Sequence, residues 1–314
     1  MEKFNDQRRG HIRQMPIYVG KFFRMFIFLS DWKVLPMSAL IAAIVAYVTG
    51  ANMFASMEGL AMGSMALTCV CLWNGCFNSI QVVCRERGIV KREHRAGMHI
   101  SSYIGAHMVY QAFLCLVQSV ITIAVCMVGG VAFPEAGIIT PWFLVDLLIT
   151  LFLITYAADM MSLMISCIVH NTTSAMTVMP LVLIFELVFS GIMFTLNNAA
   201  QKIGYLTIAK WGMNAICGLG GYNSLPMVAA WNQLYKFRTY EVNGVQPVQT
   251  FVTYILKNGL RDDFCLEAGQ NSQVAAYAST MLNIGKSWLI LLGFAIAFAL
   301  LAMLILKFID RDKR

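Results

Sequence analysis

The sequence predicts an all-α integral membrane protein with six transmembrane helices. Three observations lead to this prediction. Hydrophobic residues make up 59% of the chain and charged residues only 12%, and the mean hydropathy is +0.67, which is more apolar surface than a water-soluble domain can bury. Six apolar runs approach or exceed the roughly 20 residues that a helix needs to cross a bilayer. Basic residues gather in alternate connecting segments, as on the cytosolic side of membrane proteins.

The six predicted spans are separated by short connections, except before the last one. We place them at residues 34–48, 60–83, 104–128, 142–169, 177–196 and 287–308. The first span is the shortest and borrows Trp32 and Thr49 at the membrane interfaces. The third and fourth are long enough to tilt. Together with their connections, the spans define one membrane domain over residues 34–308.

The lysine and arginine residues decide the predicted orientation. Seven of the 23 lie in the first 33 residues, five between residues 84 and 99, and four after residue 306. With six spans these segments share one face, and the basic excess marks it as cytosolic. Both termini are therefore predicted to be cytosolic. The net charge of +7 follows from this asymmetry, so we expect no nucleic-acid binding. We also expect no cleavable signal peptide, because the first 15 residues are polar and charged.

Polar or amphipathic segments flank and interrupt the membrane domain. Residues 1–33 are predicted to form a cytosolic tail and an amphipathic helix on the membrane surface, with apolar side chains toward the lipid and basic ones outward. Residues 309–314 form a second cytosolic tail. Residues 197–284 are the long polar insertion of the chain. We expect its first part, up to Cys217, to turn back toward the membrane and the rest to form a small external cap.

The connection between the second and third spans is strongly charged and predicts a short cytosolic helix. On that helix Glu86 and Glu93 share one face, about 10 Å apart at 1.5 Å per residue. A neighbouring basic stripe contains Arg87, Lys91 and Arg95, spaced by four residues. The alternative is a solvated loop that only sets the topology. We expect four further residues to pack up against the membrane domain: Ile89, Val90, Ala96 and Met98.

Two of the nine cysteines, Cys217 and Cys265, lie in the predicted external insertion. A disulfide bond persists outside the cytosol, but the sequence does not give the distance between these residues. A bonded pair and two free thiols therefore remain alternatives. The other seven lie in or beside spans, where cysteine packs as a small apolar residue. No Cys or His cluster has the spacing of a metal site, so we expect neither a metal site nor a catalytic site.

Several short motifs follow one another in a distinctive order. They are Glu86-Arg87, Arg92-Glu93, Ala96-Gly97-Met98, Ser102-Tyr103, Phe189-Ser190-Gly191 and Lys210-Trp211-Gly212-Met213-Asn214-Ala215. In order and spacing they resemble the membrane domain of the G subfamily of ABC transporters, which exports sterols, lipids and drugs, and of its bacterial relatives. The resemblance extends to the order of elements: a surface helix, five spans, a re-entrant segment, an external loop and a last span.

The resemblance implies a permease subunit of an ATP-driven exporter in the plasma membrane, of bacterial origin. Its cargo would be an amphipathic or hydrophobic small molecule, lipid or peptide. A second permease subunit, identical or different, would complete a central cavity, surrounded by membrane lipids. An ATP-binding subunit would dock on residues 84–100. The implied coupling residues are Glu86, Arg87, Lys91, Arg92, Glu93 and Gly97.

The ATPase is expected on a separate subunit, because this sequence contains no P-loop. Gly285-Lys286-Ser287 has the required ending, but Thr280 stands where the first glycine is needed. ATP and Mg²⁺ would therefore be bound by the partner, and no cofactor by this chain.

Cargo contacts are expected where polar or aromatic side chains lie inside the membrane. Asn74, Phe77 and Asn78 resemble a cargo-contacting patch of the family, and hydrogen bonding between helices is the alternative for both asparagines. Asp159 and Glu186 lie at equal depth on antiparallel spans. They predict either a neutral, hydrogen-bonded pair or acidic groups that face the cavity. The predicted cavity residues are Asn74, Phe77, Asn78, Asp159, Glu186 and Phe189.

The alternative function is a secondary transporter or channel subunit that works without ATP. Its usual signature, paired broken helices in two similar halves, is absent from the sequence. A membrane-embedded enzyme is disfavoured further, because the five histidines form no cluster. Asp146, near the outer end of the fourth span, is expected to make a structural hydrogen bond or to contact water.

Overall fold

The structure is a computed structural model that describes residues 10–28, 31–191, 198–241 and 246–308. The described residues form helices and connections without a β-strand, and one isolated bridge joins Ala136 and Trp142. The predicted tails at residues 1–9 and 309–314, and the end of the fifth predicted span from residue 192, lie outside the described residues.

Five helical segments are long and apolar enough to cross a membrane. They are α2 (Val34–Thr49, continued by η2, Gly50–Phe54), α3 with α4 (Met57–Ser79 and Val82–Arg95), α5 (Ile100–Val128), α6 (Phe143–Ile168) and α13 (Met281–Lys307). This finding supports a multi-pass membrane protein. The helix α7 (Thr172–Val188) is apolar but has 17 residues, about 26 Å at 1.5 Å per residue, less than the roughly 30 Å of a hydrocarbon core. The fifth predicted span, residues 177–196, therefore stays a prediction.

The remaining elements are shorter. They are α1 (His11–Phe28), α8 (Asn198–Gly204), α9 (Ile208–Leu219), α10 (Val228–Lys236), α11 (Pro247–Lys257), α12 (Arg261–Gln270), and the 3-10 helices η1 (Asp31–Lys33), η3 (Tyr222–Ser224), η4 (Phe237–Thr239) and η5 (Ala275–Tyr277).

The helix α6 lies at the centre of the bundle. It packs against α3, α5, α9 and α13 and is the most buried of the five long apolar segments. Close approach to α3 is allowed by Gly75, where a Cβ would collide with the backbone oxygen of Thr155 and come within 2.8 Å of Ala158 Cβ. Small residues allow this kind of contact between membrane helices.

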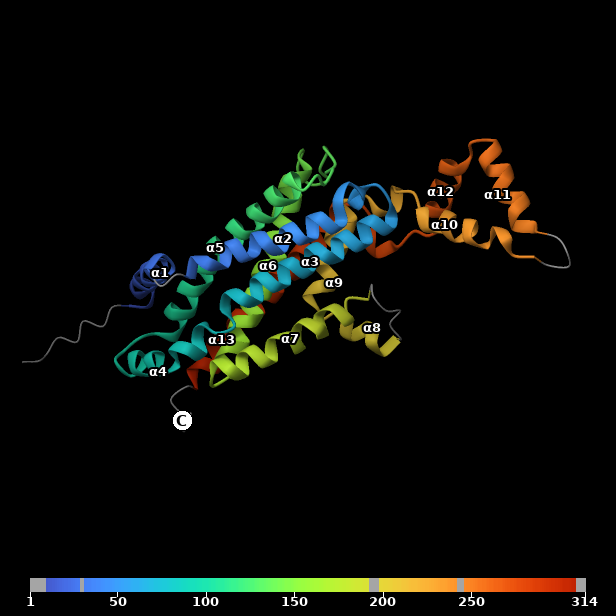
Figure 1. Ribbon diagram of the computed structural model, residues 1–314. Coiled ribbons are helices and arrows are strands. Elements are labelled where there is room, and N and C mark those ends of the chain that lie inside the picture. Colours follow the sequence, from blue (N-terminus) through green and yellow to red (C-terminus); the bar gives the residue numbers. More distant parts are fainter. Residues whose placement is uncertain (1–9, 29–30, 192–197, 242–245, 309–314) are drawn as a thin grey trace, which may run out of the picture.

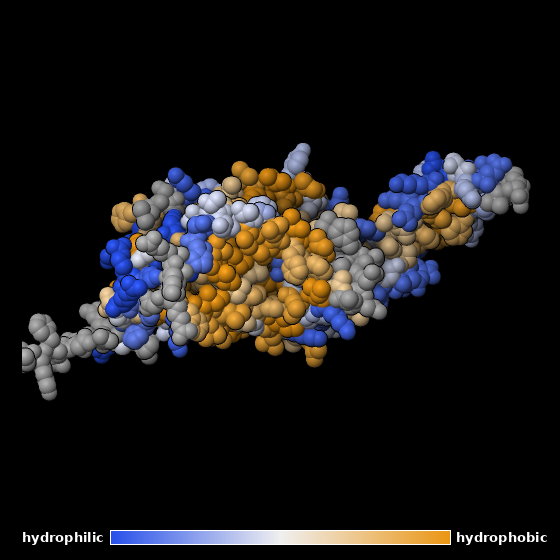
Figure 2. All heavy atoms as spheres, turned by 90° about the horizontal axis from the view of Figure 1, so that it is seen from below, coloured by the Kyte–Doolittle hydropathy of each residue, from blue (hydrophilic) through white to orange (hydrophobic). Residues whose placement is uncertain are grey.

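The two ends of the bundle differ in what they carry. Figure 1 shows α1, α4 and the end of α13 together at one end, while α10, α11 and α12 project from the opposite end. Figure 2 shows a broad hydrophobic face across the bundle between them, with hydrophilic residues gathered at the end of α1 and α4 and on the projecting helices. This distribution fits a body embedded in lipid.

The projecting helices α10 to α12, residues 228–270, form a helical arm with a small core of its own. The core contains Trp231, Val252, Ile255 and Cys265. Its connection to the bundle includes the Glu58 carboxylate, which accepts a hydrogen bond from the Ala229 N–H at 2.9 Å. The sequence predicted a small external cap in this part of the chain, and the structure has a three-helix arm there; its place outside the membrane stays a prediction.

The structure contradicts a disulfide bond between Cys217 and Cys265, because both are free thiols. Cys217 is buried on α9, with its Sγ 3.1 Å from Ser64 Oγ of α3. Cys265 belongs to the separate core of the arm. Cys217 thus packs in the bundle and Cys265 in the arm, a difference that could not be predicted from the sequence.

Asp146 organises the connection between α5 and α6. Its buried carboxylate accepts hydrogen bonds from the N–H groups of Ile138, Ile139 and Thr140 at 2.9, 2.9 and 3.0 Å. The predicted structural hydrogen bond is confirmed.

Candidate functional site

The charged helix predicted between the second and third spans exists as α4. It ends in a tight turn in which Met98 N–H donates to the Glu93 carbonyl at 2.9 Å and Gly97 N–H donates to the His94 carbonyl at 3.1 Å. This pair of bonds defines a Schellman motif. Gly97 has a φ of +107°, a backbone conformation that glycine adopts without a steric penalty. The small residue and glycine of the motif therefore serve to stop the helix.

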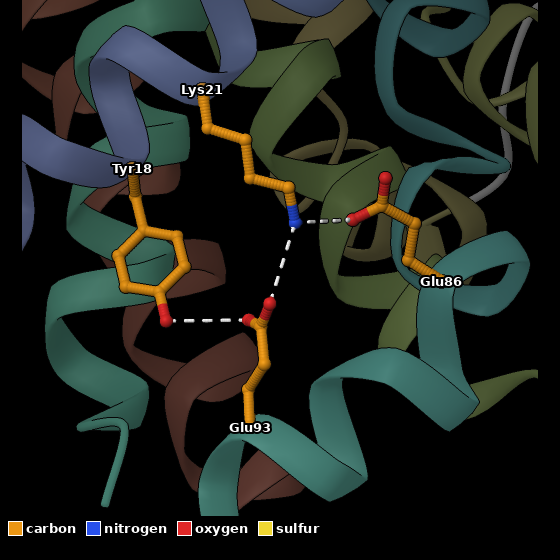
Figure 3. Close-up of polar contacts among 4 residues, drawn as sticks. All are labelled: Tyr18, Lys21, Glu86 and Glu93. Atoms are coloured by element: carbon orange, nitrogen blue, oxygen red, sulfur yellow. Dashed lines mark hydrogen bonds and ion pairs between the residues drawn. The ribbon is translucent and has the colours of Figure 1, made fainter. Parts of the chain in front are cut away.

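Both acidic residues of α4 face α1, on the same side of the helix as predicted. Lys21 Nζ lies 3.4 Å from Glu86 Oε2 and 3.8 Å from Glu93 Oε1, as Figure 3 shows. The Tyr18 hydroxyl donates to Glu93 Oε2 at 3.2 Å. Burial, assisted by the charge of Glu93, raises the pKa of Tyr18 to about 12, so the hydroxyl keeps its proton and remains a donor. One lysine therefore joins two carboxylates and fastens α4 to α1.

The end of α4 is also held by α1. Gln14 Nε2 donates to the Gly97 carbonyl at 3.3 Å, and His99 N–H donates to Gln14 Oε1 at 3.0 Å. Gln14, Tyr18 and Lys21 follow a spacing of four and three residues, which places them on one face of α1. That face forms a polar clamp on α4.

The helix α6 holds α4 from the other side. Arg87 Nη1 donates to the carbonyls of Cys167 and Val169 at 2.9 and 3.2 Å, where the carbonyl end of a helix dipole favours a cation. At the start of α4, the Val83 and Cys84 N–H groups donate to Ser166 Oγ at 3.1 and 3.2 Å. The helix α4 is therefore bonded on two sides, to α1 and to the central helix α6.

The exposed face of α4 differs from the predicted one. Val90 and Met98 are buried as expected, but Ile89 is 41% exposed and Ala96 also faces outward. Consecutive residues of a helix point about 100° apart, and Ile89 lies on the exposed face of Arg85 and Arg92, while Val90 is buried. The exposed stripe consists of Arg85, Gly88, Ile89, Arg92, Arg95 and Ala96.

This α4 stripe contains only one of the predicted coupling residues, Arg92. Glu86, Arg87 and Glu93 are bound within the chain as described above, and Lys91 and Gly97 are partly buried. Ile89 is the residue that the sequence reasoning misplaced. The spacing of Arg85, Ile89 and Arg92 by four and three residues is the signal that could have identified the stripe.

Reversing the charge of Lys21 tests the clamp between α1 and α4. Lys21→Glu places a third carboxylate beside Glu86 and Glu93, so we expect a loss of about 1 kcal/mol of stability, measured as a lower thermal midpoint in detergent. Arg24→Glu is the control, because Arg24 is an exposed residue of the same helix. Adding Glu86→Lys to Lys21→Glu should restore part of the loss. Equal thermal midpoints for Lys21→Glu and Arg24→Glu would contradict the clamp.

The two asparagines predicted near cargo make hydrogen bonds between helices. Asn74 Nδ2 donates to Ser38 Oγ of α2 at 2.9 Å. Asn78 and Gln118 of α5 exchange two hydrogen bonds, at 2.8 and 3.0 Å. Both side chains are buried. The alternative of interhelical hydrogen bonding is confirmed for both residues.

Asp159 and Glu186 are buried but do not form the predicted pair. Asp159 Oδ2 accepts from Cys115 Sγ of α5 at 3.3 Å. Glu186 Oε2 accepts from the Ala209 N–H at 2.9 Å, in the first turn of α9, where free N–H groups favour a carboxylate. Each carboxylate therefore joins its own helix to a different neighbour, and the prediction of an Asp159–Glu186 hydrogen bond is wrong.

An apolar groove of about 550 Å³ opens between α2 and α3. Phe77 lines it together with Trp73, whose ring centroid is 5.3 Å away. The other lining residues are Met37, Ile41, Val45, Met62, Met65, Ala66, Cys69 and Val70. Phe189, the remaining predicted cavity residue, lies at the end of α7 with its ring 4.7 Å from that of Phe185. The groove can accommodate an apolar molecule.

The described residues contain no group of three or more His, Cys, Asp or Glu side chains that could hold a metal ion.

Comparisons with known proteins give the family. Over 132 residues, 41% of this chain, the sequence is 25% identical to an ABC transporter ATP-binding/permease protein of Mycobacterium tuberculosis (strain ATCC 25618 / H37Rv). The match spans 15% of the length of that relative. Residues 21–219, more than half of the chain, match the ABC-2 type transporter family. This segment runs from Lys21 of the polar clamp through α4 to the end of α9. The chain therefore belongs to the ABC-2 type transporter family and contains its membrane domain.

Proposed function

We propose that this chain is the permease subunit of an ATP-driven exporter, energised by a separate ATP-binding subunit that docks on the α4 stripe. The observation that carries the proposal is the way α4 is held. Its buried side is fastened to α1 through Lys21 and to α6 through Arg87, while its outer side presents Ile89 between Arg85 and Arg92. A partner that displaces this outer side of α4 would therefore move the membrane domain through these contacts, with no flexible linker between them.

The chemistry of the α4 stripe suggests the kind of surface that receives it. Ile89 offers an apolar contact at its centre, and such central apolar residues carry much of the energy of an interface. The surrounding arginines favour a partner surface that carries carboxylates. That partner binds ATP and Mg²⁺ and hydrolyses the ATP.

The proposed orientation places α4, α1 and both ends of the chain in the cytosol of a bacterial cell, with the arm outside the plasma membrane. The basic residues of α4 support it. The helix α7 supports a second permease subunit, because it exposes a row of apolar residues, Leu181, Ile184 and Phe185. Two such rows from identical or different subunits, with surrounding lipid, would enclose a path across the membrane.

The proposed cargo is an amphipathic or hydrophobic small molecule, lipid or peptide. The groove between α2 and α3 supports an apolar cargo, since its described lining contains no charged side chain. Phe77 is the predicted cavity residue that lines it. Asn74, Asn78, Asp159 and Glu186 serve instead to join helices.

Co-purification from the native membrane tests the proposed function. We expect an ATP-binding subunit to remain bound to the tagged chain in lipid discs, and we expect hydrolysis of ATP by that complex to rise when hydrophobic cargo is added. Transport into vesicles that requires ATP would support export. Transport driven by an ion gradient, with no bound ATPase, would overturn the proposal in favour of a secondary transporter or channel subunit.

A further inference from the structure

Two lysines of different helices approach the same pair of aromatic rings at the arm end of the bundle. Lys210 Nζ, on α9, lies 3.5 Å from the ring centroid of Tyr205. Lys286 Nζ, on α13, lies 5.8 Å from the ring centroid of Trp211. The two ring centroids are 6.0 Å apart. Segments more than 70 residues apart in the sequence thus build one small cationic and aromatic surface.

This surface is held in place by its surroundings. The indole N–H of Trp211 donates to the Tyr205 carbonyl at 2.9 Å, which fixes one ring against the other. The first turn of α9, which carries Lys210, is bonded to α7 through the hydrogen bond from Ala209 N–H to the Glu186 carboxylate. Since α9 is buried against α3, α6 and α13, the backbone positions from which the two lysines extend are fixed relative to each other.

Both lysines carry positive charge without a negative partner. The ion pairs of Lys21 lie at the opposite end of the bundle, and none is found for Lys210 or Lys286 in the described part of the chain. Both side chains reach the same aromatic pair, and an anion that binds there would be attracted by both positive charges. Aromatic rings beneath the ammonium groups add a favourable but weaker contact.

The depth of Lys286 in the membrane follows from α13. The helix ends at Lys307, and residues 287–306 between the two lysines contain no charged residue. At about 1.5 Å per residue they extend about 30 Å, which equals the thickness of a hydrocarbon core. Lys286 therefore lies at the level of the lipid headgroups on the side of the arm.

A lipid-facing stripe runs along α13 directly below Lys286. It consists of Leu289, Gly293, Ile296 and Leu300, which follow Lys286 at three-, seven-, ten- and fourteen-residue steps on one helix face. Leu289 is 71% exposed. At Gly293 nothing lies within 4 Å of the position of a Cβ, so the stripe has a shallow depression. An extended hydrocarbon chain fits along such a track.

We propose that Lys210 and Lys286 bind the phosphate of an anionic glycerophospholipid in the leaflet on the side of the arm, with an acyl chain along the α13 stripe. The bound lipid joins α9 to α13. This site is independent of ATP and of the direction of transport, and it goes beyond the proposed function.

Native mass spectrometry of the purified chain tests the site. After titration with phosphatidylglycerol or phosphatidylcholine of the same acyl chains, we expect one phosphatidylglycerol to be retained under conditions that remove phosphatidylcholine. The Lys210→Gln/Lys286→Gln variant should bind phosphatidylglycerol roughly 30-fold more weakly, because each lysine near a membrane surface contributes about a factor of five. The matched control is Lys236→Gln/Lys257→Gln, which removes two lysines from the arm.

Other outcomes of this titration would overturn the proposal. Equal retention of both lipids, or unchanged retention in the Lys210→Gln/Lys286→Gln variant, overturns the proposal. Displacement of the lipid by inorganic phosphate overturns the role of the acyl chain, because a free anion would then suffice. A thermal midpoint equal to that of the unmodified chain in the absence of lipid shows that the variant is folded.

Discussion

The Ile89→Asp variant should lose at least about 90% of the ATP-binding subunit that co-purifies with the unmodified chain. Burial of an isoleucine contributes roughly 1.5–3 kcal/mol, and about 1.4 kcal/mol corresponds to a tenfold change in affinity. The aspartate adds the cost of an unpaired charge in the interface. Because Ile89 is 41% exposed and does not belong to the buried core, the variant should fold. The measurement is the amount of ATPase retained on the immobilised chain.

Leu256→Asp is the matched control for this variant. Leu256 is also an exposed aliphatic residue of a short helix, but it lies on the arm at the opposite end of the molecule. We expect it to retain the ATPase. If Ile89→Asp retained the ATPase as well, docking on the α4 stripe would be disproved even though the clamp on α1 and α6 remained correct.

The Gly75→Val variant should fail to accumulate as a folded protein. At this residue α3 and α6 touch through their backbones, and the Thr155 carbonyl occupies the place of a Cβ. Overpacking of a core usually costs about 1–3 kcal/mol, and here the colliding atom belongs to the backbone and cannot change rotamer. We therefore expect separation of the two helices. Size-exclusion chromatography of a fluorescent fusion should show aggregate in place of a single peak.

Gly293→Val controls for the change of a helical glycine itself. Gly293 lies within α13, and nothing stands within 4 Å of a Cβ added there. Valine at that residue faces lipid, so we expect the elution profile of the unmodified chain. Gly75→Ala should give an intermediate yield, since it adds one methyl group. A normal profile for Gly75→Val would show that α3 and α6 do not pack as described.

The candidate site was predictable to the extent that it depends on local order. The charged residues around Glu86 and Glu93 predicted a polar helix. Their seven-residue spacing predicted both acids on one face, because spacing along a helix determines direction around its axis. The same rule applied to Ile89 gave the wrong result, since an apolar residue was assumed to face the membrane. Lys21 of α1 occupies the acidic face instead, and the helix is turned so that Ile89 points outward.

The buried polar residues show a second limit of the sequence. Asp159 and Glu186 were paired by equal depth on neighbouring helices, but depth gives no information about rotation. The structure turns Asp159 toward Cys115 and Glu186 toward the start of α9. Cys217 and Cys265 were compared by their side of the membrane, although they belong to different cores. Partners of this kind depend on contacts between distant segments.

The sequence by itself determined that this chain is helical, that it is built for a membrane and that a charged helix interrupts its spans. These properties follow from composition and from local periodicity, which act within a few turns of chain. Tertiary structure alone decided which face of α4 is exposed, which partners the buried acids bind, and that Lys210 and Lys286 approach one pair of aromatic rings. Those features depend on the rotation and approach of helices, and side-chain packing between distant segments determines both.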